Sequence, residues 1–423
     1  MLSKVASHTA VNVSLRLASL AGRFALTIYV AAVLGAQDLG RFGLLLGAVA
    51  AFPAISGLGL NYFMAREVVA EPSSRATIIV RDRLLVSATT AIALVGGAAL
   101  GSAAGAIDLG HMPWAAVGIV FLEVLLFDFH YALIGRDRAT LANVIIALKG
   151  AVWVPLVVIA GLVWPQFRSL DFVLYVWLAT LILTVGWLVS RTSRTDIRAL
   201  VKAPIDKVWI RDRLSGAGLI YVSDIGIVAM SYADRFVISD TLGLRAVGIF
   251  TVFWSFSNAL HTLLQTGLLQ ASLPKLVRLH KEREEAQWRS TLASTQRKLL
   301  ASGVLLSLAV YLIMILLLPP LGVEEVEGLY LLPALLLASA LIRALSDLYH
   351  QALYSRLRDY AANSVNLLGL VVAPSFALVG AHTLGLNGVG AAAVASTILI
   401  LGVRRMVLAR SLSRGDAIGT GSV

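Results

Sequence analysis

Apolar stretches of about 20 residues, the length a helix needs to cross a bilayer core, recur along the chain and are separated by short arginine-rich segments. Charged residues make up only 14% of the 423 residues, whereas soluble domains carry about a quarter. This pattern predicts an all-α polytopic membrane protein with about twelve transmembrane helices. It excludes a soluble enzyme and a disordered chain.

The basic residues divide the loops between these stretches into two sets. Most of the 35 Lys and Arg lie at the termini and in loops such as 66–77 and 275–297. The opposite loops are short, and their only basic residues are Arg41, Arg168 and Arg245. Because Lys and Arg remain on the cytoplasmic side, we predict that both termini are cytoplasmic. The net charge of +11 then reflects topology rather than nucleic-acid binding, and the external loops are too short for a catalytic domain.

Two short motifs each occur twice. The pattern LG-x4-G-x-F begins at Leu34 and again at Leu242, 208 residues later. The pattern AL-x2-R-x-R-x4-N begins at Ala132 and again at Ala352, 220 residues later. The larger second offset is accounted for by the cytoplasmic loop 275–297, which is longer than its counterpart in the first half.

Such a repeat predicts two six-helix lobes, 1–208 with helices 1–6 and 209–423 with helices 7–12. Each half has an even number of spans, so both enter from the same side and are related by a pseudo-two-fold axis along the membrane normal. Lobes of this kind enclose a central cavity, and rocking them gives alternating access. The alternative is that the glycine motifs mark only tight turns.

Ten ionisable side chains fall inside the predicted spans, where each costs about 2.5–3.5 kcal/mol at the helix centre and usually faces a cavity or a partner. The basic ones are Arg16, Arg23, Lys149, Arg235 and Arg343, and the acidic ones are Glu123, Asp128, Asp224, Asp234 and Asp347. Because the two signs are equal in number, composition does not require an anionic substrate. It indicates a polar interior, as in a transporter.

Arg16 and Arg23 are seven residues apart, so a helix presents them on one face. A guanidinium stays charged and binds oxyanions with two parallel hydrogen bonds. The pair therefore suits a ligand that carries phosphate. The alternative is that these arginines pair with Glu123 or Asp128 and only stabilise the bundle.

The remaining intramembrane groups allow both structural and functional interpretations. Arg343 and Asp347 stand one helical turn apart, and we expect them to pair. Lys149 and Asp224 have no partner on their own helices, so they are either functional or joined in a salt bridge between spans 5 and 7.

Adjacent residues on a helix point in different directions, so one of Asp234 and Arg235 is expected to face the cleft and the other the lipid headgroups. The acids Glu123, Asp128 and Asp224 are candidates to bind a coupling proton or cation.

Several chemistries have no motif in this chain. There is no P-loop, no HExxH and no Cys/His metal spacing, and the chain contains no cysteine. We therefore expect neither a metal nor another cofactor. The segment Lys275–Lys298 is predicted to form an amphipathic helical hairpin on the membrane surface.

Six short segments carry a family resemblance: Leu34–Gly43, Gly57–Asn61, Ala65–Glu67, Ala233–Arg235, Leu242–Thr251 and Leu386–Ala392. Together they resemble the polysaccharide and O-antigen flippases of the multidrug/oligosaccharidyl-lipid/polysaccharide (MOP) exporter superfamily. The resemblance implies a MATE-like fold whose spans 1, 2, 7 and 8 line a cationic cavity. Arg16, Arg23 and Arg235 would then face the cavity, whereas the place of Arg343 on span 10 is less clear.

The resemblance also implies a function. Such a flippase moves undecaprenyl-diphosphate-linked oligosaccharide from the cytoplasmic to the periplasmic leaflet of the bacterial inner membrane, for O-antigen, capsule or exopolysaccharide synthesis. Its partners would be the lipid-linked glycan, the bilayer, and a polysaccharide polymerase or other assembly proteins. The alternative is a cation-coupled multidrug or small-molecule antiporter of the same fold, in which Glu123, Asp128 and Asp224 are essential.

Overall fold

The computed structural model describes residues 2–104, 114–136, 138–191, 203–321 and 328–413, and every regular element in these ranges is a helix. Contacts divide the chain into Met1–Val228 and Ala229–Val423, named here unit 1 and unit 2. The lobe boundary between residues 208 and 209 is predicted from the repeated motifs, and it stays a prediction. The predicted external loop 107–113 and residues 192–202 of the predicted cytoplasmic loop 191–213 lie outside the described residues.

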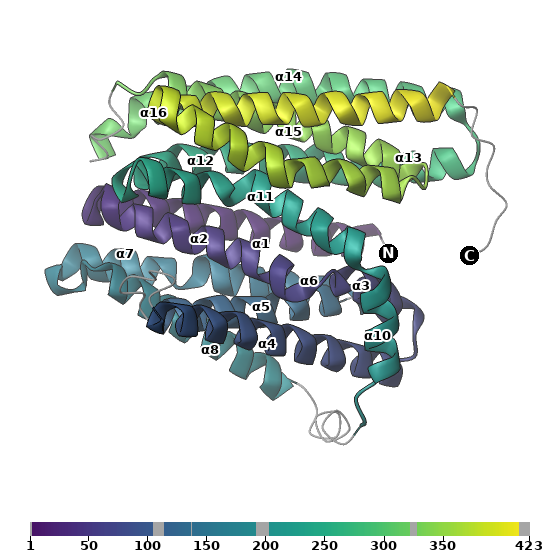
Figure 1. The fold of residues 1–423 in the computed structure, drawn as a ribbon, viewed down its shortest axis with the longest axis horizontal. Helices are drawn as coiled ribbons and strands as arrows, with labels where there is room; N and C mark the ends of the chain where they lie inside the picture. Colours follow the sequence, from purple (N-terminus) through teal and green to yellow (C-terminus); the bar gives the residue numbers. More distant parts are fainter. Residues whose placement is uncertain (1, 105–113, 137, 192–202, 322–327, 414–423) are drawn as a thin grey trace. The chain divides into compact units, whose positions relative to one another are not determined.

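Unit 1 is a bundle of long apolar helices joined by short connections (Figure 1). Its helices are α1 (Leu2–Tyr29), α2 (Ala36–Gly57), α3 (Leu60–Ala70), α4 (Ser73–Ala103), α5 (Trp114–Gly135), α6 (Ala139–Ala147), α7 (Val154–Val163), α8 (Leu170–Arg191) and α10 (Lys207–Gly216). Short π turns continue α1 over Val30–Leu34 (η1) and join α6 to α7 over Leu148–Val152 (η2), and the 3-10 turn η3 covers Pro165–Phe167. The unit boundary falls within α11 (Gly218–Thr241).

Unit 2 continues from the second part of α11 with α12 (Leu244–Leu264), the π turn η4 (Gln265–Leu269), α13 (Gln270–Lys281), α14 (Glu285–Leu317), the 3-10 turn η5 (Pro319–Leu321), α15 (Leu331–Ser355) and α16 (Asp359–Ser413). The backbone of α16 leaves helical geometry at Leu384 and Gly385. A Cβ atom on Gly380 or Gly388 would overlap the backbone of the other glycine. The two arms of α16 therefore fold back against each other, as Figure 1 shows.

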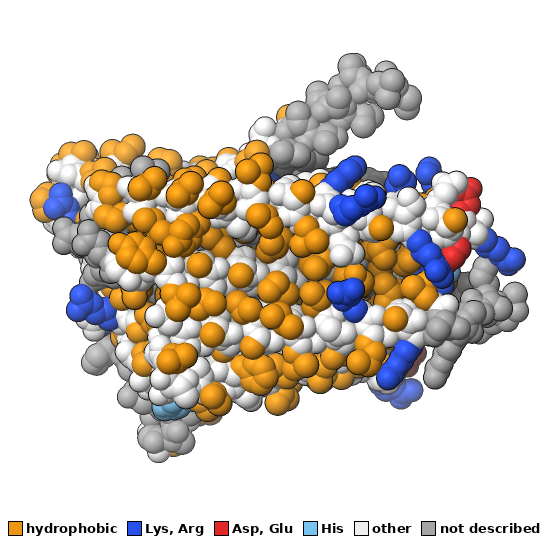
Figure 2. Space-filling view, turned by 90° about the horizontal axis from the view of Figure 1, so that it is seen from above, with side chains coloured by type: hydrophobic (Ala, Val, Ile, Leu, Met, Phe, Trp, Pro, Cys, Tyr) orange, Lys and Arg blue, Asp and Glu red, His pale blue; other side chains and the backbone are white. Residues whose placement is uncertain are grey.

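Ten of the described helices are long and apolar enough to cross a membrane, or eleven if the bent pair α10–α11 forms one span. The folded-back α16 is counted once in that number. Exposed large apolar side chains occur on many helices, such as Leu100, Leu183 and Leu305. Figure 2 shows a face covered by hydrophobic side chains, with Lys and Arg gathered towards one end. The prediction of an all-α multi-pass membrane protein is confirmed.

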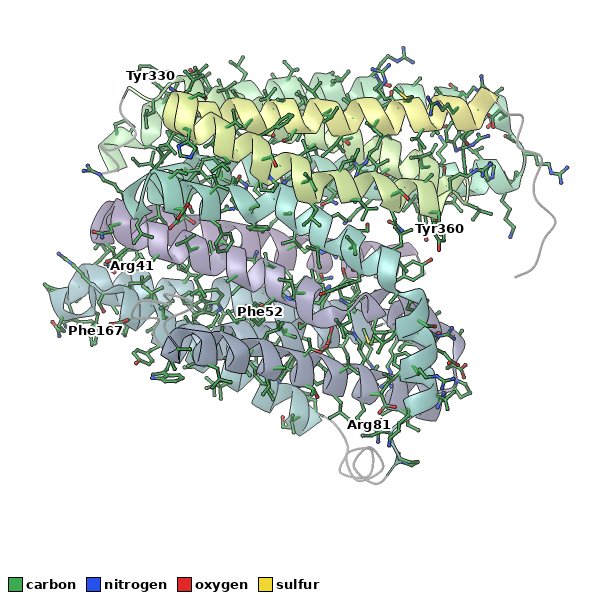
Figure 3. All side chains as sticks on the ribbon, viewed as in Figure 1. Arg41, Phe52, Arg81, Phe167, Tyr330 and Tyr360 are labelled. Carbon is green, nitrogen blue, oxygen red and sulfur yellow. The ribbon has the colours of Figure 1, made fainter. Side chains whose placement is uncertain are left out.

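Within each unit, the loops predicted to lie on opposite sides of the membrane lie at opposite ends. In unit 1, Arg41 and Phe167 lie at one end and Arg81 at the other (Figure 3). In unit 2, Tyr330 and Tyr360 are separated in the same way. The long helices therefore run from one predicted side to the other.

The backbone at the two repeated motifs has the same geometry in both units. Gly35 has φ 88° and ψ 169°, and Gly243 has φ 85° and ψ 171°. The N–H of each glycine donates to a carbonyl five residues earlier at 3.0 Å. At the second motif, the N–H groups of Arg138 and Arg358 likewise donate to carbonyls five residues back, at 2.9 and 3.1 Å. The repeat seen in the sequence is therefore a repeat of local structure.

The predicted surface hairpin forms, but its apolar side does not face lipid. Helix α13 and the start of α14 are joined at Arg283, which has a left-handed φ of 61°. Leu276, Leu279 and Trp288 are buried, and the indole of Trp288 donates to the Ser355 hydroxyl on α15 at 3.1 Å. The hairpin packs on unit 2, because α15 offers its apolar side a protein surface.

Candidate functional site

In unit 1, two of the predicted basic residues have protein partners. The Nε of Arg16 donates to the Asn143 side chain at 2.9 Å, and Lys149 forms an ion pair with Glu123. Lys149 lies in the π turn η2, which adds a residue to a helical turn. This turn packs directly on α1, since a Cβ on Gly22 would lie 2.6 Å from the Cα of Ala151.

Arg23 differs from both, because its side chain is exposed and forms no hydrogen bond or ion pair with any described residue. The expectation that Arg16 or Arg23 pairs with Glu123 or Asp128 is therefore wrong for the described part of the chain. Arg23 remains a charged group able to bind a ligand.

Asp128 belongs to a buried network that the sequence did not reveal. Its carboxylate pairs with Arg83 at 3.1 Å, and the two side chains are 1% and 0% exposed. The hydroxyl of Ser87 donates to the same carboxylate at 2.5 Å, and Arg83 also donates to Asn61 at 2.7 Å. This network makes Asp128 part of the structural core of unit 1.

Asp224 remains without such a partner. Its carboxylate accepts no hydrogen bond from the described residues, and the charge that acts on it is Arg83, which is already paired with Asp128. The proposed salt bridge between Lys149 and Asp224 is wrong, since Lys149 pairs with Glu123.

In unit 2, Arg235 and Arg343 meet at Ser231. Arg235 donates to the Ser231 carbonyl at 3.2 Å, and Arg343 donates to the Ser231 hydroxyl at 3.3 Å. A second nitrogen of Arg343 donates to the Asn258 side chain at 3.1 Å. Helices α11, α12 and α15 thus bring two guanidinium groups together.

Arg235 is completely buried and covered by aromatic rings. Its guanidinium carbon lies 3.9 Å from the ring centre of Trp254 and 4.9 Å from that of Tyr232. Asp234 is 3.5 Å from the guanidinium and 16% exposed. The expectation that Asp234 and Arg235 point to different environments is therefore wrong, because the two side chains contact each other.

Arg235 and Arg343 both retain buried hydrogen-bond donors that no described group accepts. These are the Nε and one terminal nitrogen of Arg235, and the Nε of Arg343. A buried unmade hydrogen bond costs about 1–3 kcal/mol, and more for a charged group. Two adjacent cations with free donors form a site suited to an anion with several oxygen atoms.

Asp347 does not pair with Arg343, contrary to expectation. Its carboxylate lies 2.9 Å from the Nε2 of His261 and 3.3 Å from Arg404. Arg404 also donates to Ser346 at 2.8 Å and to Asn366 at 2.6 Å. Asp347 on α15 is thus held by residues of α12 and α16, and Arg343 instead donates to the Ser231 hydroxyl.

Sequence reasoning missed Arg83 and Arg404, the two arginines that pair with Asp128 and Asp347. Both lie near an end of a predicted span, where arginines were assigned to the cytoplasmic flank. Each is nevertheless buried. The available signal was a polar residue on a neighbouring span, Asn61 for Arg83 and Asn366 for Arg404.

Neither a protein-family model nor a curated protein sequence matches the chain. Solved structures do match it. A multidrug-resistance MATE family transporter of the MOP superfamily in an inward-facing conformation is 18% identical, with a TM-score of 0.69 over 96% of this chain and 99% of the other. An outward-facing structure of such a transporter is 17% identical, with a TM-score of 0.57 over 96% of each chain.

A Vibrio cholerae MATE transporter is also similar, at 14% identity and a TM-score of 0.55 over 98% of this chain and 99% of the other. At these identities the likeness shows the fold alone. The chain is a multi-pass membrane protein with a MATE-like fold over nearly its whole length. These solved structures, which share this fold, are transporters.

Proposed function

We propose that the chain is an alternating-access transporter of the MOP superfamily, and that it flips a polyprenyl-diphosphate-linked oligosaccharide to the periplasmic leaflet. The observation that carries this proposal is the pair of arginines at Ser231. Arg235 and Arg343 are adjacent, Arg235 fully buried and Arg343 partly buried, and both retain buried N–H donors that no described group accepts. Only one carboxylate, that of Asp234, contacts them among the described residues.

A diphosphate matches this pair in charge and geometry. It carries several oxygen acceptors around two phosphorus atoms, and guanidinium groups bind such oxygens with parallel, charge-assisted hydrogen bonds. A cationic drug would be repelled by the same two groups. The site therefore favours an anionic cargo over a cationic one.

Binding requires the aromatic cover of Arg235 to yield. A desolvated cation–π contact is worth about 2 kcal/mol, whereas each hydrogen bond to a charged group contributes about 1.5–3 kcal/mol. A diphosphate that makes two such bonds can therefore displace the guanidinium from Trp254. The glycan would occupy the polar interior, and the polyprenyl tail would stay in lipid.

Unit 1 contributes its own cations to the proposed cargo path. Arg23 is the strongest candidate because its guanidinium is exposed and has no partner among the described residues. Arg16 is oriented by Asn143 and is assigned a supporting contact. Lys149 is assigned a structural role with Glu123, since the ion pair satisfies both.

The proposed setting follows from the positive-inside rule and the proposed cargo. We place the protein in the bacterial inner membrane with both termini in the cytoplasm. A polymerase or another assembly protein that consumes flipped glycan is the expected partner.

One observation favours a second candidate, a cation-coupled antiporter. Asp224 is an intramembrane acid that accepts no hydrogen bond from the described residues, and such a carboxylate suits a proton or an alkali cation. In an antiporter the acids would be essential and the arginines dispensable.

Binding measurements separate the two candidates. The full-length protein in nanodiscs is titrated with undecaprenyl diphosphate, undecaprenol and the cationic dye ethidium, and complexes are quantified by native mass spectrometry. We expect the diphosphate to bind, and Arg343→Ala to weaken it by about ten- to a hundredfold, from the loss of a charge-assisted contact of about 1.5–3 kcal/mol. Arg245→Ala, on an exposed external residue, is the matched control. Equal binding of undecaprenol, or ethidium binding that Arg343→Ala leaves unchanged and Asp224→Asn abolishes, would overturn the flippase proposal.

A further inference from the structure

Helices α10 and α11 meet at a bend of 65°. The bend lies in the covalent connection between the two halves of the chain, where a hinge is the obvious interpretation. The contacts on either side of the bend indicate the opposite.

Helix α10 is attached to the other helices of unit 1 through Trp209. Its ring is 6% exposed and lies in a cluster with Met64, Val68, Ala76 and Ile79. The indole N–H donates to the Glu67 carboxylate at 2.5 Å, and Glu67 also pairs with Arg213 at 2.6 Å. Burying an aromatic side chain contributes about 1.5–3 kcal/mol, so this contact alone holds α10 on α3 and α4.

The residue before α10 adds a second attachment. Asp206 caps the helix by accepting the Trp209 backbone N–H at 2.8 Å, and its carboxylate pairs with Arg75 at 2.5 Å. The backbone N–H of Asp206 donates to the buried carboxylate of Asp82 at 2.9 Å. The cap and Arg75 both favour the charged form and hold the pKa of Asp206 below its usual value.

Arg81 completes this attachment from α4. Its guanidinium donates to the carbonyls of Ala203 and Pro204 at 2.5 and 2.9 Å and pairs with Asp82 at 2.5 Å. Figure 3 labels Arg81 at the end of α4 next to α10. The segment 203–216 is thus fixed to unit 1 along its length.

The far side of the bend is held as well. Gly59, between α2 and α3, has a left-handed φ of 73°, and a Cβ there would lie 3.0 Å from both the Ala217 carbonyl and the Tyr221 nitrogen. The backbone of the turn between α2 and α3 therefore touches the first turn of α11 directly.

We propose that α10 and the first turns of α11 form a rigid extension of unit 1, here named the clamp, which consists of residues 203–221. The bend at Ala217 is then a fixed corner. The boundary between the two units lies further along α11, between Val228 and Ala229, and the proposal assigns the flexible point of the connection to that boundary.

The proposal can be tested without any ligand, because the chain has no native cysteine. Pairs of spin labels are placed in the full-length protein in nanodiscs, and their distances are measured by pulsed electron paramagnetic resonance. Ile92→Cys on α4, Arg211→Cys on α10 and Gly218→Cys at the start of α11 are exposed sites. Leu305→Cys on α14 adds a label in unit 2, so the pair 92–305 measures a distance between the two units.

We expect narrow, single distance distributions for 92–211 and 92–218, and a broader one for 92–305. Trp209→Ala combined with Glu67→Gln should broaden 92–211 at least twofold. Gly97→Ala is the matched control, since no atom lies within 4 Å of a Cβ added there. A broad 92–211 distribution beside a narrow 92–218 distribution would make the bend a hinge and overturn the proposal. An unchanged 92–211 width after the clamp substitutions would also overturn it.

Discussion

The two units share a backbone plan but differ in where their charges go. The glycine turns after α1 and α11 have nearly the same dihedral angles. Yet equivalent positions carry opposite charges: Glu123 corresponds to Arg343 at the offset of 220, and Arg16 corresponds to Asp224 at the offset of 208. The two units therefore share the geometry of their glycine turns and differ in the charges of their interiors.

The two units differ in how their intramembrane charges are paired. In unit 1, most intramembrane charges have a partner of opposite charge or a polar partner, as in Lys149 with Glu123 and Arg83 with Asp128, although one terminal nitrogen of Arg83 has no partner among the described residues. In unit 2, Asp347 contacts Arg404 and His261 instead of pairing with Arg343. Arg343 lies beside Arg235, and both retain buried N–H donors without a partner among the described residues. This pair of arginines in unit 2 is the proposed site for an anionic ligand.

The largest expected effect comes from breaking the internal pair of unit 1. Arg83→Leu leaves the carboxylate of Asp128 buried without a cation, and removing one partner of a buried pair costs about 3–5 kcal/mol. Unfolding in mixed micelles with increasing dodecyl sulfate, followed by circular dichroism, measures the loss. Arg83→Leu with Asp128→Leu should recover most of it, because both charges are then gone.

Arg404→Leu is the matched change in unit 2, because it removes the cation that pairs with Asp347. Asp347 keeps its contact with His261, and its side chain is 28% exposed, whereas that of Asp128 is 1% exposed. The loss should therefore be smaller than for Arg83→Leu. Equal losses would show that the two networks are equivalent despite their different partners.

A smaller effect is expected at the shared corners. Gly35 and Gly243 both have a positive φ with ψ near 170°, a region that is essentially restricted to glycine and costs other residues about 1–3 kcal/mol. An added Cβ meets no atom within 4 Å at either position, so the cost is purely conformational. Gly35→Ala and Gly243→Ala should destabilise the protein by similar amounts in the same unfolding assay. A marked inequality would contradict a common backbone plan.

These corners also show why part of the structure could be predicted from sequence. A glycine in a restricted conformation leaves a fixed spacing in the chain, and apolar length reveals a span. Pairing of buried charges depends instead on the rotation and depth of neighbouring helices. Lys149 reaches Glu123 from within a π turn that no spacing rule anticipates. Arg83 and Arg404 look like flanking charges, because the polar partners Asn61 and Asn366 do not by themselves show which neighbouring helix they face.

The smallest effect concerns the clamp, which has no described counterpart in unit 2. Because the pKa of Asp206 is lowered in the folded protein, its contribution is fully present above the unfolded value of about 3.9 and is lost as the pH falls through the lower, folded value. A helix cap of this kind contributes about 0.5–2 kcal/mol. The 92–211 distance distribution should thus be unchanged from neutral pH down to about pH 4 and broaden below it.

Asp206→Asn provides the control for this pH dependence. Asparagine still caps the helix but cannot pair with Arg75, so the variant should be slightly broader at neutral pH and should show no acid transition of its own. An acid transition that persists in Asp206→Asn would assign the pH dependence to another carboxylate. The next residue to replace would then be Glu67, which accepts the hydrogen bond of the Trp209 indole. In that case the cap would contribute negligibly to the stability of the clamp compared with the buried indole.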